Sequence, residues 1–159
     1  MKKIVIAVVI LTFAVVGIAC AADHGTPAEA KAMLDKAIAF YKANGQEKAF
    51  AAFNNPKGPF VAKDLYIYVL DMNGKMLAHG AKPALIGKNM KNIKDADQEI
   101  FLEESVWMAK HLGVGMVDYK WENPKSSVVE QKSAFFQRVG NVILSCGFYK
   151  TYPWKELQY

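Results

Sequence analysis

The sequence predicts an α+β domain, in which helices pack on an antiparallel β-sheet. Two observations lead to this fold class. A stripe of apolar residues recurs at helical spacing near the start of the chain, and the pairs Asn73-Gly74 and Gly140-Asn141 each separate two runs of strand-forming residues. Strands joined by such short turns are antiparallel. The predicted order is therefore a helix, a short helix, two strands, a helix and three strands.

Residues 1–22 have the pattern of a secretory signal peptide. A positively charged start precedes the apolar stretch 4–18, and small residues follow at the spacing of a cleavage site. Cleavage leaves residues 23–159 as a single exported domain, periplasmic or secreted. Two alternatives stay open. One is an uncleaved membrane anchor, although the apolar stretch is shorter than the roughly 20 residues of a spanning helix. The other is a lipid on Cys20, although Gly17 stands where a bulky aliphatic residue is expected.

The charge balance makes nucleic acid a poor candidate partner. Without Lys2 and Lys3, 18 of the 20 basic residues remain against 15 acidic ones, a net charge of +3 that is spread along the chain. No motif for haem attachment, phosphate binding or dinucleotide binding occurs, and no G-x-S-x-G elbow surrounds Ser145. The 3 histidines are too dispersed for a metal site, and Cys146 has no cysteine partner after cleavage. Neither catalysis nor a metal nor a cofactor is expected.

The first helix begins at a capping box, in which Thr26 precedes Pro27 and is followed three residues later by Glu29. Its apolar stripe faces the sheet, and Asn44-Gly45 can terminate it. A short amphipathic segment, residues 46–55, follows before a stretch rich in helix breakers. A later helix is predicted from near Asp97 to Leu112. After it, "VGMVDYKW" alternates as a strand that places Val117, Tyr119 and Trp121 on one side.

The last hairpin separates two different faces if Gly140-Asn141 is a two-residue turn. Val139 then pairs with Val142, and the register follows along the ladder. On one face Phe135 lies opposite Cys146 and Gln137 opposite Leu144, a mostly apolar surface suited to receive the first helix. The other face pairs Lys132 with Tyr149, Ala134 with Gly147 and Phe136 with Ser145, so small residues leave space beside a lysine. A buried ammonium without a partner is costly, so this lysine is expected to meet an anion.

The first hairpin, "DLYIYVLDMNGKMLAHG", allows two registers. A two-residue turn at Asn73-Gly74 sets His79 opposite Tyr68, with Tyr66 on the same face; a three-residue loop with a glycine bulge sets His79 opposite Ile67. The first register is favoured because it collects the polar aromatic groups on one side. The hairpin is then one wall of a small polar pocket suited to a short carboxylate, with lysine and histidine for charge, tyrosine hydroxyls for hydrogen bonds and tryptophan as an apolar floor.

The ordered stretches "AKAMLDKAIAFYKANGQEKAFAAFNNPKGPF", "DLYIYVLDMNGKMLAHG", "LIGKNM", "GVGMVDYKWENP", "KSAFFQRV" and "CGFYK" resemble the single Cache domain family of PAS-like extracytoplasmic sensors. They span residues 28–150. The resemblance implies a long N-terminal helix on an antiparallel sheet of about five strands, with a ligand pocket on the sheet's opposite face. It also implies a small organic acid as ligand, such as acetate, pyruvate, lactate or propionate. The candidate ligand-binding residues are Tyr66, Tyr68, His79, Tyr119, Trp121, Lys132 and Tyr149.

Two departures from the family pattern stand out. Gly80 occupies a position where proline is common, and no second apolar segment or signalling domain follows the pattern. The resemblance therefore implies a free-standing periplasmic version that presents its ligand to a membrane-bound histidine kinase or chemoreceptor. A homodimer through the long helix stays open, as does a structural or interaction module with a vestigial pocket. Each candidate also has a structural interpretation: Lys132 can extend to solvent, and the aromatic residues can be core.

Overall fold

The computed structural model describes residues 24–91, 93–94 and 101–150. The predicted signal peptide and the predicted start of the second helix, residues 97–100, lie outside the described residues. The helical elements are α1 (Pro27–Phe53), the 3₁₀ helix η1 (Pro83–Leu85) and α2 (Phe101–His111). The strands are β1 (Val61–Ala62), β2 (Leu65–Asp71), β3 (Met76–His79), β4 (Val114–Glu122), β5 (Val129–Val139) and β6 (Val142–Tyr149). The α+β class is confirmed.

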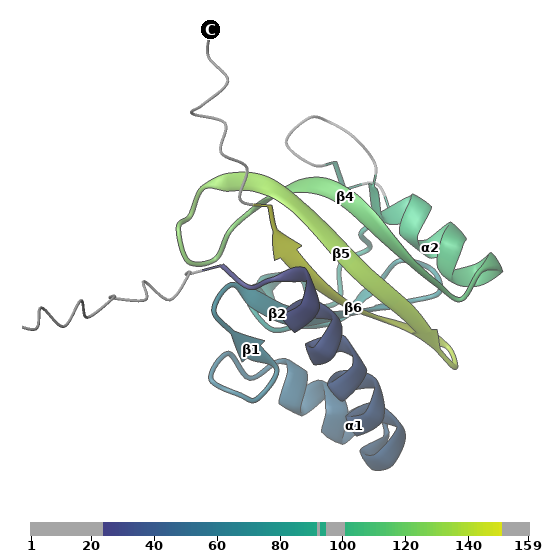
Figure 1. The fold of residues 1–159 in the computed structure, drawn as a ribbon. Coiled ribbons are helices and arrows are strands. Elements are labelled where there is room, and N and C mark those ends of the chain that lie inside the picture. The colour runs from purple at the N-terminus through teal and green to yellow at the C-terminus, as the bar shows by residue number, and fades with distance from the viewer. Residues whose placement is uncertain (1–23, 92, 95–100, 151–159) are drawn as a thin grey trace, which may run out of the picture.

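Helix α1 begins at the predicted capping box. The Thr26 hydroxyl accepts the Glu29 N–H at 3.2 Å, and the Glu29 carboxylate accepts the Thr26 N–H at 2.8 Å. Gly45 then leaves helical geometry with φ 77° and ψ 172°, and the two halves of α1 fold back on each other (Figure 1). The Phe40 and Phe53 ring centroids are 6.4 Å apart, whereas a straight helix would separate these residues by about 20 Å. The predicted break at Asn44-Gly45 and the short second segment are confirmed.

The described strands form one six-stranded antiparallel sheet, in which five strands have the order β1-β2-β6-β5-β4. The remaining strand, β3, pairs with the same edge of β2 as β1 does, further along β2. The sixth strand, beyond the five expected, is the two-residue β1. The β5–β6 register is as predicted, with Val139 opposite Val142 and Lys132 opposite Tyr149. Strand β2 lies between β6 on one side and β1 and β3 on the other, so the pocket candidates Tyr66 and Tyr68 on it are held by neighbours on both sides.

The β2–β3 hairpin gives the favoured pairing of Tyr68 with His79, but the predicted two-residue turn is wrong. The Asp71 N–H donates to the Lys75 carbonyl at 2.9 Å, which closes a three-residue loop, and Asp71 Oδ1 accepts the Asn73 and Lys75 N–H groups. A β-bulge around Leu77 then shifts the register back by one residue. The two irregularities cancel, which is why His79 still faces Tyr68.

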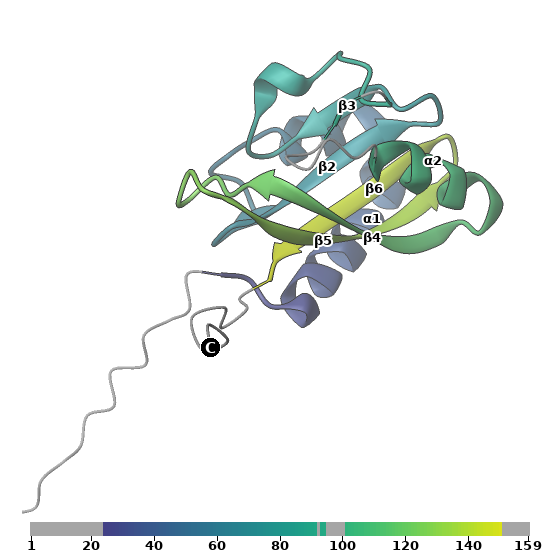
Figure 2. The same cartoon turned by 90° about the horizontal axis from the view of Figure 1, so that it is seen from above.

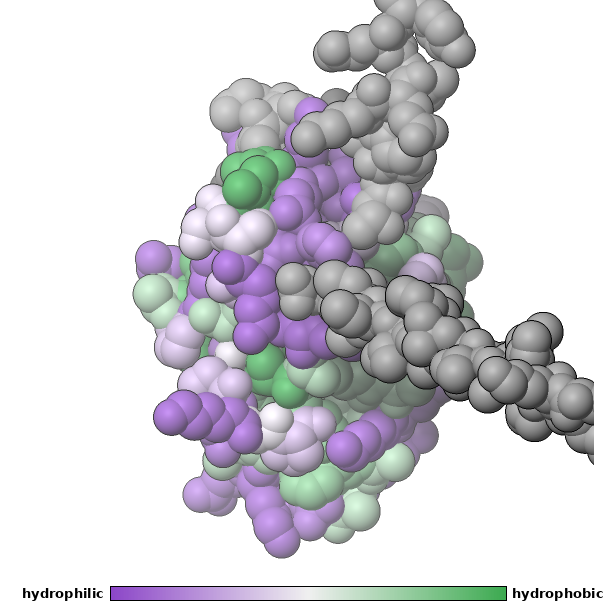
Figure 3. All heavy atoms as spheres, turned by 60° about the vertical axis from the view of Figure 1, so that its left-hand side comes forward, coloured by the Kyte–Doolittle hydropathy of each residue, from purple (hydrophilic) through white to green (hydrophobic). Residues whose placement is uncertain are grey.

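The sheet is covered on both faces (Figure 2). Helix α1 packs on one face, against apolar residues of β2 and β6, and α2 packs on the other, mainly against β4. The core on the α2 side contains polar aromatic residues and two methionines, whereas the core on the α1 side is built from aliphatic and phenylalanine side chains. The face shown in Figure 3 is mainly hydrophilic, with small separated apolar patches. Among the described residues, neither α-helix combines the length and the apolar character needed to cross a bilayer.

Candidate ligand pocket

A pocket with a cavity volume of about 20 Å³ lies on the α2 side of the sheet. It is lined by residues of β2, β3, β4, the loop before α2 and α2 itself: Tyr66, Tyr68, Met76, His79, Met90, Leu102, Tyr119 and Trp121. Five of the seven sequence-predicted candidates are therefore brought together on one pocket. Lys132 and Tyr149 do not line it, although both contact a residue that does.

Three apolar lining residues were missed from the sequence. Met76 lies in a strand where simple alternation would put it on the same face as Ala78, but the bulge around Leu77 turns Met76 to the pocket side. Met90 lies in a loop and Leu102 near the start of α2, and no local pattern assigns either residue to a pocket. These side chains make part of the pocket wall apolar, which suits the carbon chain of a ligand rather than its charge.

His79 presents a neutral ring to the pocket. Its Nδ1 accepts the backbone N–H groups of Ala81 at 3.2 Å and Lys82 at 2.8 Å, so the proton of the neutral imidazole is on Nε2. Burial, together with the positive charges of Lys132 and Lys82, lowers the pKa of His79 to about 3. At neutral pH the ring therefore offers an uncharged N–H donor. The His79 backbone N–H donates to Asn54 Oδ1 at 2.8 Å, which ties the strand to the end of α1.

Three buried tyrosines supply hydroxyl groups around this histidine. The Tyr66 ring lies 4.8 Å from the His79 ring and the Tyr68 ring stacks on it at 6.1 Å, centroid to centroid. Burial raises the pKa of Tyr66, Tyr68 and Tyr119, so all three stay protonated at physiological pH. The Trp121 ring meets that of Tyr119 edge-on at 6.1 Å. The pocket thus has a mainly apolar, largely aromatic wall, and the neutral hydroxyl groups of its tyrosines are hydrogen-bonded behind that wall, Tyr66 with Tyr149 and Tyr68 with Tyr119.

The amine of Lys132 lies behind Tyr66. Nζ donates to the Tyr66 hydroxyl at 2.6 Å and to the Tyr149 hydroxyl at 3.3 Å, and it sits 3.9 Å from the centroid of the Tyr66 ring. The side chain has 0% of its surface exposed. A Cβ on Gly147 would lie 2.3 Å from Lys132 Cε, so the glycine makes room for the lysine stem. Part of the space that the small residues leave is therefore filled by Lys132 itself.

The Lys132 amine has hydroxyl partners but no carboxylate partner. Among the residues that the structure describes, no ion pair includes Lys132. Burial lowers its pKa to about 7, against smaller opposing effects of Cys146 and Asp64. The Tyr149 hydroxyl donates to the Glu122 carbonyl at 2.9 Å, which leaves its oxygen lone pairs toward the amine. Among the described residues, the buried amine thus has no carboxylate in contact, and it lies next to a mainly apolar pocket.

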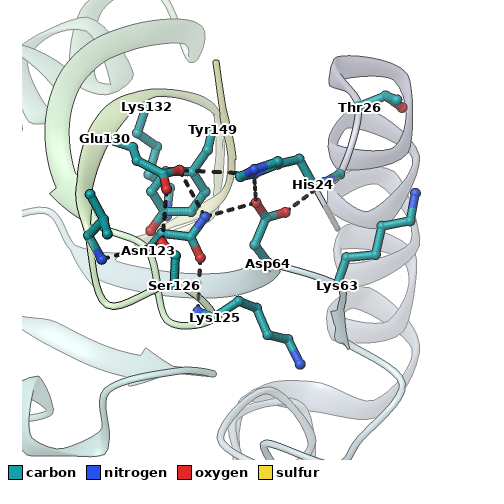
Figure 4. A network of polar contacts seen from close by, with 12 residues as sticks. His24, Thr26, Lys63, Asp64, Asn123, Lys125, Ser126, Glu130, Lys132 and Tyr149 are labelled. Carbon is teal, nitrogen blue, oxygen red and sulfur yellow. Dashed lines mark hydrogen bonds and ion pairs between the residues drawn. The ribbon is translucent and has the colours of Figure 1, made fainter. Parts of the chain in front are cut away.

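A second polar network adjoins this amine (Figure 4). Buried Asp64 accepts the Gly25 N–H at 2.7 Å and the Asn123 side-chain amide at 3.1 Å, and its Oδ2 lies 2.7 Å from His24 Nδ1. Asn123 also donates to Glu130 at 3.0 Å. The network joins the residues before α1, the start of β2 and the β4–β5 connection. Sequence analysis missed it, because a lone acid ahead of a strand and an asparagine in a loop give no distinctive signal.

Known proteins share both the sequence pattern and the fold. Residues 3–151 match the family model of Single Cache domain 2. The chain is 31% identical over 74 residues to the methyl-accepting chemotaxis protein McpP of Pseudomonas putida, a match that covers 46% of this chain and 14% of that protein. It is 30% identical over 73 residues to the sensor histidine kinase MctS of Rhizobium johnstonii, a match that covers 46% of this chain and 16% of that protein. The match spans only a small part of the length of each curated relative.

Solved structures give the same picture. A methyl-accepting chemotaxis protein of Vibrio parahaemolyticus superposes with a TM-score of 0.64 at 19% identity, over 75% of this chain and 84% of that one. The periplasmic sensor domain of a chemotaxis protein superposes with a TM-score of 0.59 at 22% identity, over 77% of this chain and 88% of that one. At this identity the likeness shows the fold alone. A structure described as the basis for carboxylic acid recognition by a Cache chemosensory domain superposes with a TM-score of 0.59 at 26% identity, over 77% of this chain and 86% of that one. The chain belongs to the Single Cache domain 2 family, the extracytoplasmic sensor domains of chemotaxis receptors and histidine kinases.

Proposed function

We propose that this domain binds a short organic acid of the acetate, pyruvate, lactate and propionate class, leaves it chemically unchanged and serves signal transduction. The observation that carries the proposal is the pairing of a small pocket with a neighbouring buried amine that forms no ion pair with any described carboxylate. A carboxylate in the pocket would accept hydrogen bonds from His79 and the tyrosines and would supply the missing negative charge. The Cache structure described as recognising carboxylic acid supports the ligand class.

Pocket size favours a ligand of a few heavy atoms. The cavity volume of about 20 Å³ is little more than one water molecule needs, so a nucleotide would not be enclosed. One amine and one neutral histidine suit a single carboxylate, and Met76, Met90 and Leu102 suit a short apolar tail. A mainly apolar lining with a few buried polar groups supports a short acid with a small apolar tail.

The same proposal includes a cellular setting. The signal peptide predicted over residues 1–22 would deliver the domain to the periplasm, where it would present its ligand state to a membrane-bound chemoreceptor or histidine kinase. The chemotaxis protein and the sensor kinase among its relatives support this class of partner. The long helix α1 is the surface through which a homodimer would form.

A thermal-shift screen tests the ligand. The purified chain is heated with the sodium salts of acetate, propionate, pyruvate and L-lactate, with sodium chloride at equal ionic strength as the control. A ligand that binds only the folded state raises Tm by mass action. At least one acid should raise Tm at millimolar concentration, and the shift should be smaller in Tyr66→Phe but unchanged in Tyr41→Phe, a tyrosine of α1. No shift with any of the four acids would contradict the proposal.

A second candidate function is an interaction module with a vestigial pocket. One observation favours it: apolar side chains are exposed on α2, directly after it and at the start of β4, including Trp107 at 56% and Leu112 at 63%. Trp107→Ala separates the two functions. Retained acid binding together with lost partner capture would place the partner on α2, whereas unchanged capture would leave the exposed tryptophan without this role.

A further inference from the structure

We propose that the organic acid is bound together with one proton, which the Lys132 amine takes up as the carboxylate enters. This inference rests on the proposed function, because it needs an anionic ligand in the pocket. It adds a regulatory property: occupancy of the sensor depends on pH as well as on the concentration of the acid.

Burial without a counter-ion makes the charged form of Lys132 unfavourable in the empty protein. An ammonium of zero exposure loses its hydration, and two neutral hydroxyls at 2.6 Å and 3.3 Å replace that hydration only in part. The pKa of about 7 means that a large share of the molecules hold a neutral amine at neutral pH. A free lysine, by contrast, would be charged throughout this range.

Other titratable and charged groups lie around the amine. Those that contact it or interact with it electrostatically are Asp64, Tyr66, His79, Lys82, Cys146 and Tyr149. Tyr119 pairs with Lys132 across the sheet, and Glu122 and Glu130 act on Tyr149. Burial raises the pKa of the tyrosines and of Cys146, so these groups are already protonated. His79 is neutral until far below neutral pH. His24 contacts Asp64 rather than the amine, and the His24→Gln variant below tests its contribution.

A bound carboxylate changes the balance at Lys132. Hydrogen-bonded to the Tyr66 hydroxyl, it would lie within about 5.5 Å of Nζ, given the 2.6 Å contact between Nζ and that hydroxyl. An opposite charge at 4–6 Å favours the ammonium form and raises its pKa. The free amine must then gain a proton on binding wherever it was neutral before. Affinity is therefore expected to fall about tenfold per pH unit above 7 and to level off below it.

Calorimetry measures the proton directly. The acid of the four that gives the largest thermal shift is titrated into the purified chain at pH 8 and at pH 6, each in two buffers of different ionisation enthalpy. The difference in heat between buffers gives the protons taken up. Because the pKa of Lys132 in the protein without ligand is about 7, the expected uptake is ~0.9 proton at pH 8 and ~0.1 proton at pH 6. Binding at pH 8 with no uptake overturns the inference while leaving the proposed function intact. Absence of binding at both pH 6 and pH 8 overturns the inference and the proposed function together.

Two variants identify the acceptor. Lys132→Arg carries a permanent charge, so it should bind with no proton uptake and with an affinity that does not change between pH 6 and pH 8. His24→Gln removes the neighbouring imidazole and should keep the full uptake of the wild type. Uptake that persists in Lys132→Arg, or disappears in His24→Gln, overturns the assignment to Lys132.

An independent measurement covers the case in which arginine does not fit the site. The ¹³Cε resonance of Lys132 in isotopically labelled wild-type protein is followed against pH without ligand. A titration midpoint near 7 is expected, moving upward when the acid is added. A midpoint above 9 in the free protein overturns the inference.

Discussion

The Tyr66 hydroxyl accepts a hydrogen bond from Lys132 Nζ at 2.6 Å, while the Tyr66 ring lines the pocket beside His79 at 4.8 Å. One side chain thus touches both the buried amine and the space for a ligand. Because an oxygen that accepts from a cation donates its own proton more strongly, the amine can act on a ligand through Tyr66 without lining the pocket. The predictions below test this relationship and the packing that maintains it.

Removing the amine should weaken ligand binding. Lys132→Ala is expected to lose about 1.5–3 kcal/mol of binding free energy, the usual size of a hydrogen bond to a charged group. Affinity for the best acid of the screen is measured by calorimetry at pH 6, where the wild-type amine is mostly charged. The matched control is Lys31→Ala on the exposed face of α1, which should bind as the wild type does. Equal affinity of Lys132→Ala and wild type would show that the pocket acts without the amine.

Stability should rise with pH through two windows. Lys132 has a pKa of about 7 when folded and about 10.4 when unfolded, so between these values the unfolded chain binds more protons and the free energy of unfolding increases with pH. His79, with a folded pKa of about 3, gives the same sign between pH 3 and about 6.5. Urea unfolding of wild type and Lys132→Met at pH 7 and pH 9.5 measures the first window.

The increase in the free energy of unfolding from pH 7 to pH 9.5 should be clearly larger in the wild type than in Lys132→Met. His79→Asn should lose the lower window and keep the upper one. An identical pH profile for wild type and Lys132→Met would mean that the lysine is not held in a low-dielectric site.

Adding one methyl group at Gly147 should destabilise the domain. The new Cβ would lie 2.3 Å from Lys132 Cε, so the lysine stem or strand β6 must shift, and overpacking of this kind costs about 1–3 kcal/mol. The severe clash is with the Lys132 side chain, and the next contact is the Ser133 carbonyl oxygen at 3.2 Å. In the Lys132→Ala background, Gly147→Ala should therefore cost much less, and the double-mutant cycle should give a coupling of at least about 0.5 kcal/mol. Additive effects would place the strain elsewhere.

Asp64→Asn should loosen the start of α1. The carboxylate holds Gly25 and Asn123 by hydrogen bonds and lies beside His24, and an amide in its place puts a donor where an acceptor is needed. A buried group left partly unsatisfied costs about 1–3 kcal/mol. Hydrogen exchange at residues 25–30 should become faster while the centre of β6 stays protected. The control is Asp35→Asn, an exposed acid of α1, which should leave exchange unchanged.

Much of the fold was predictable because its signals are local. The capping box at Thr26 and the break at Gly45 depend on residues close in sequence, and the β5–β6 register follows from one turn and a period of two. That register by itself placed Lys132 beside Tyr149 and small residues. It also separated an apolar face from a polar one, which is how a ligand pocket on the second face could be expected before any coordinates.

Only the tertiary structure decided how the pocket is closed and where its charge lies. The bulge around Leu77 turns Met76 inward because the adjacent loop pairs with Met76, and Met90 and Leu102 arrive from segments with no periodic relation to the sheet. Lys132 sits behind Tyr66 because Gly147, a neighbour across the ladder, leaves room for its stem. Sequence determined which residues share a face, since that depends on backbone periodicity; which atoms meet depends on packing between distant segments, and this no local pattern encodes.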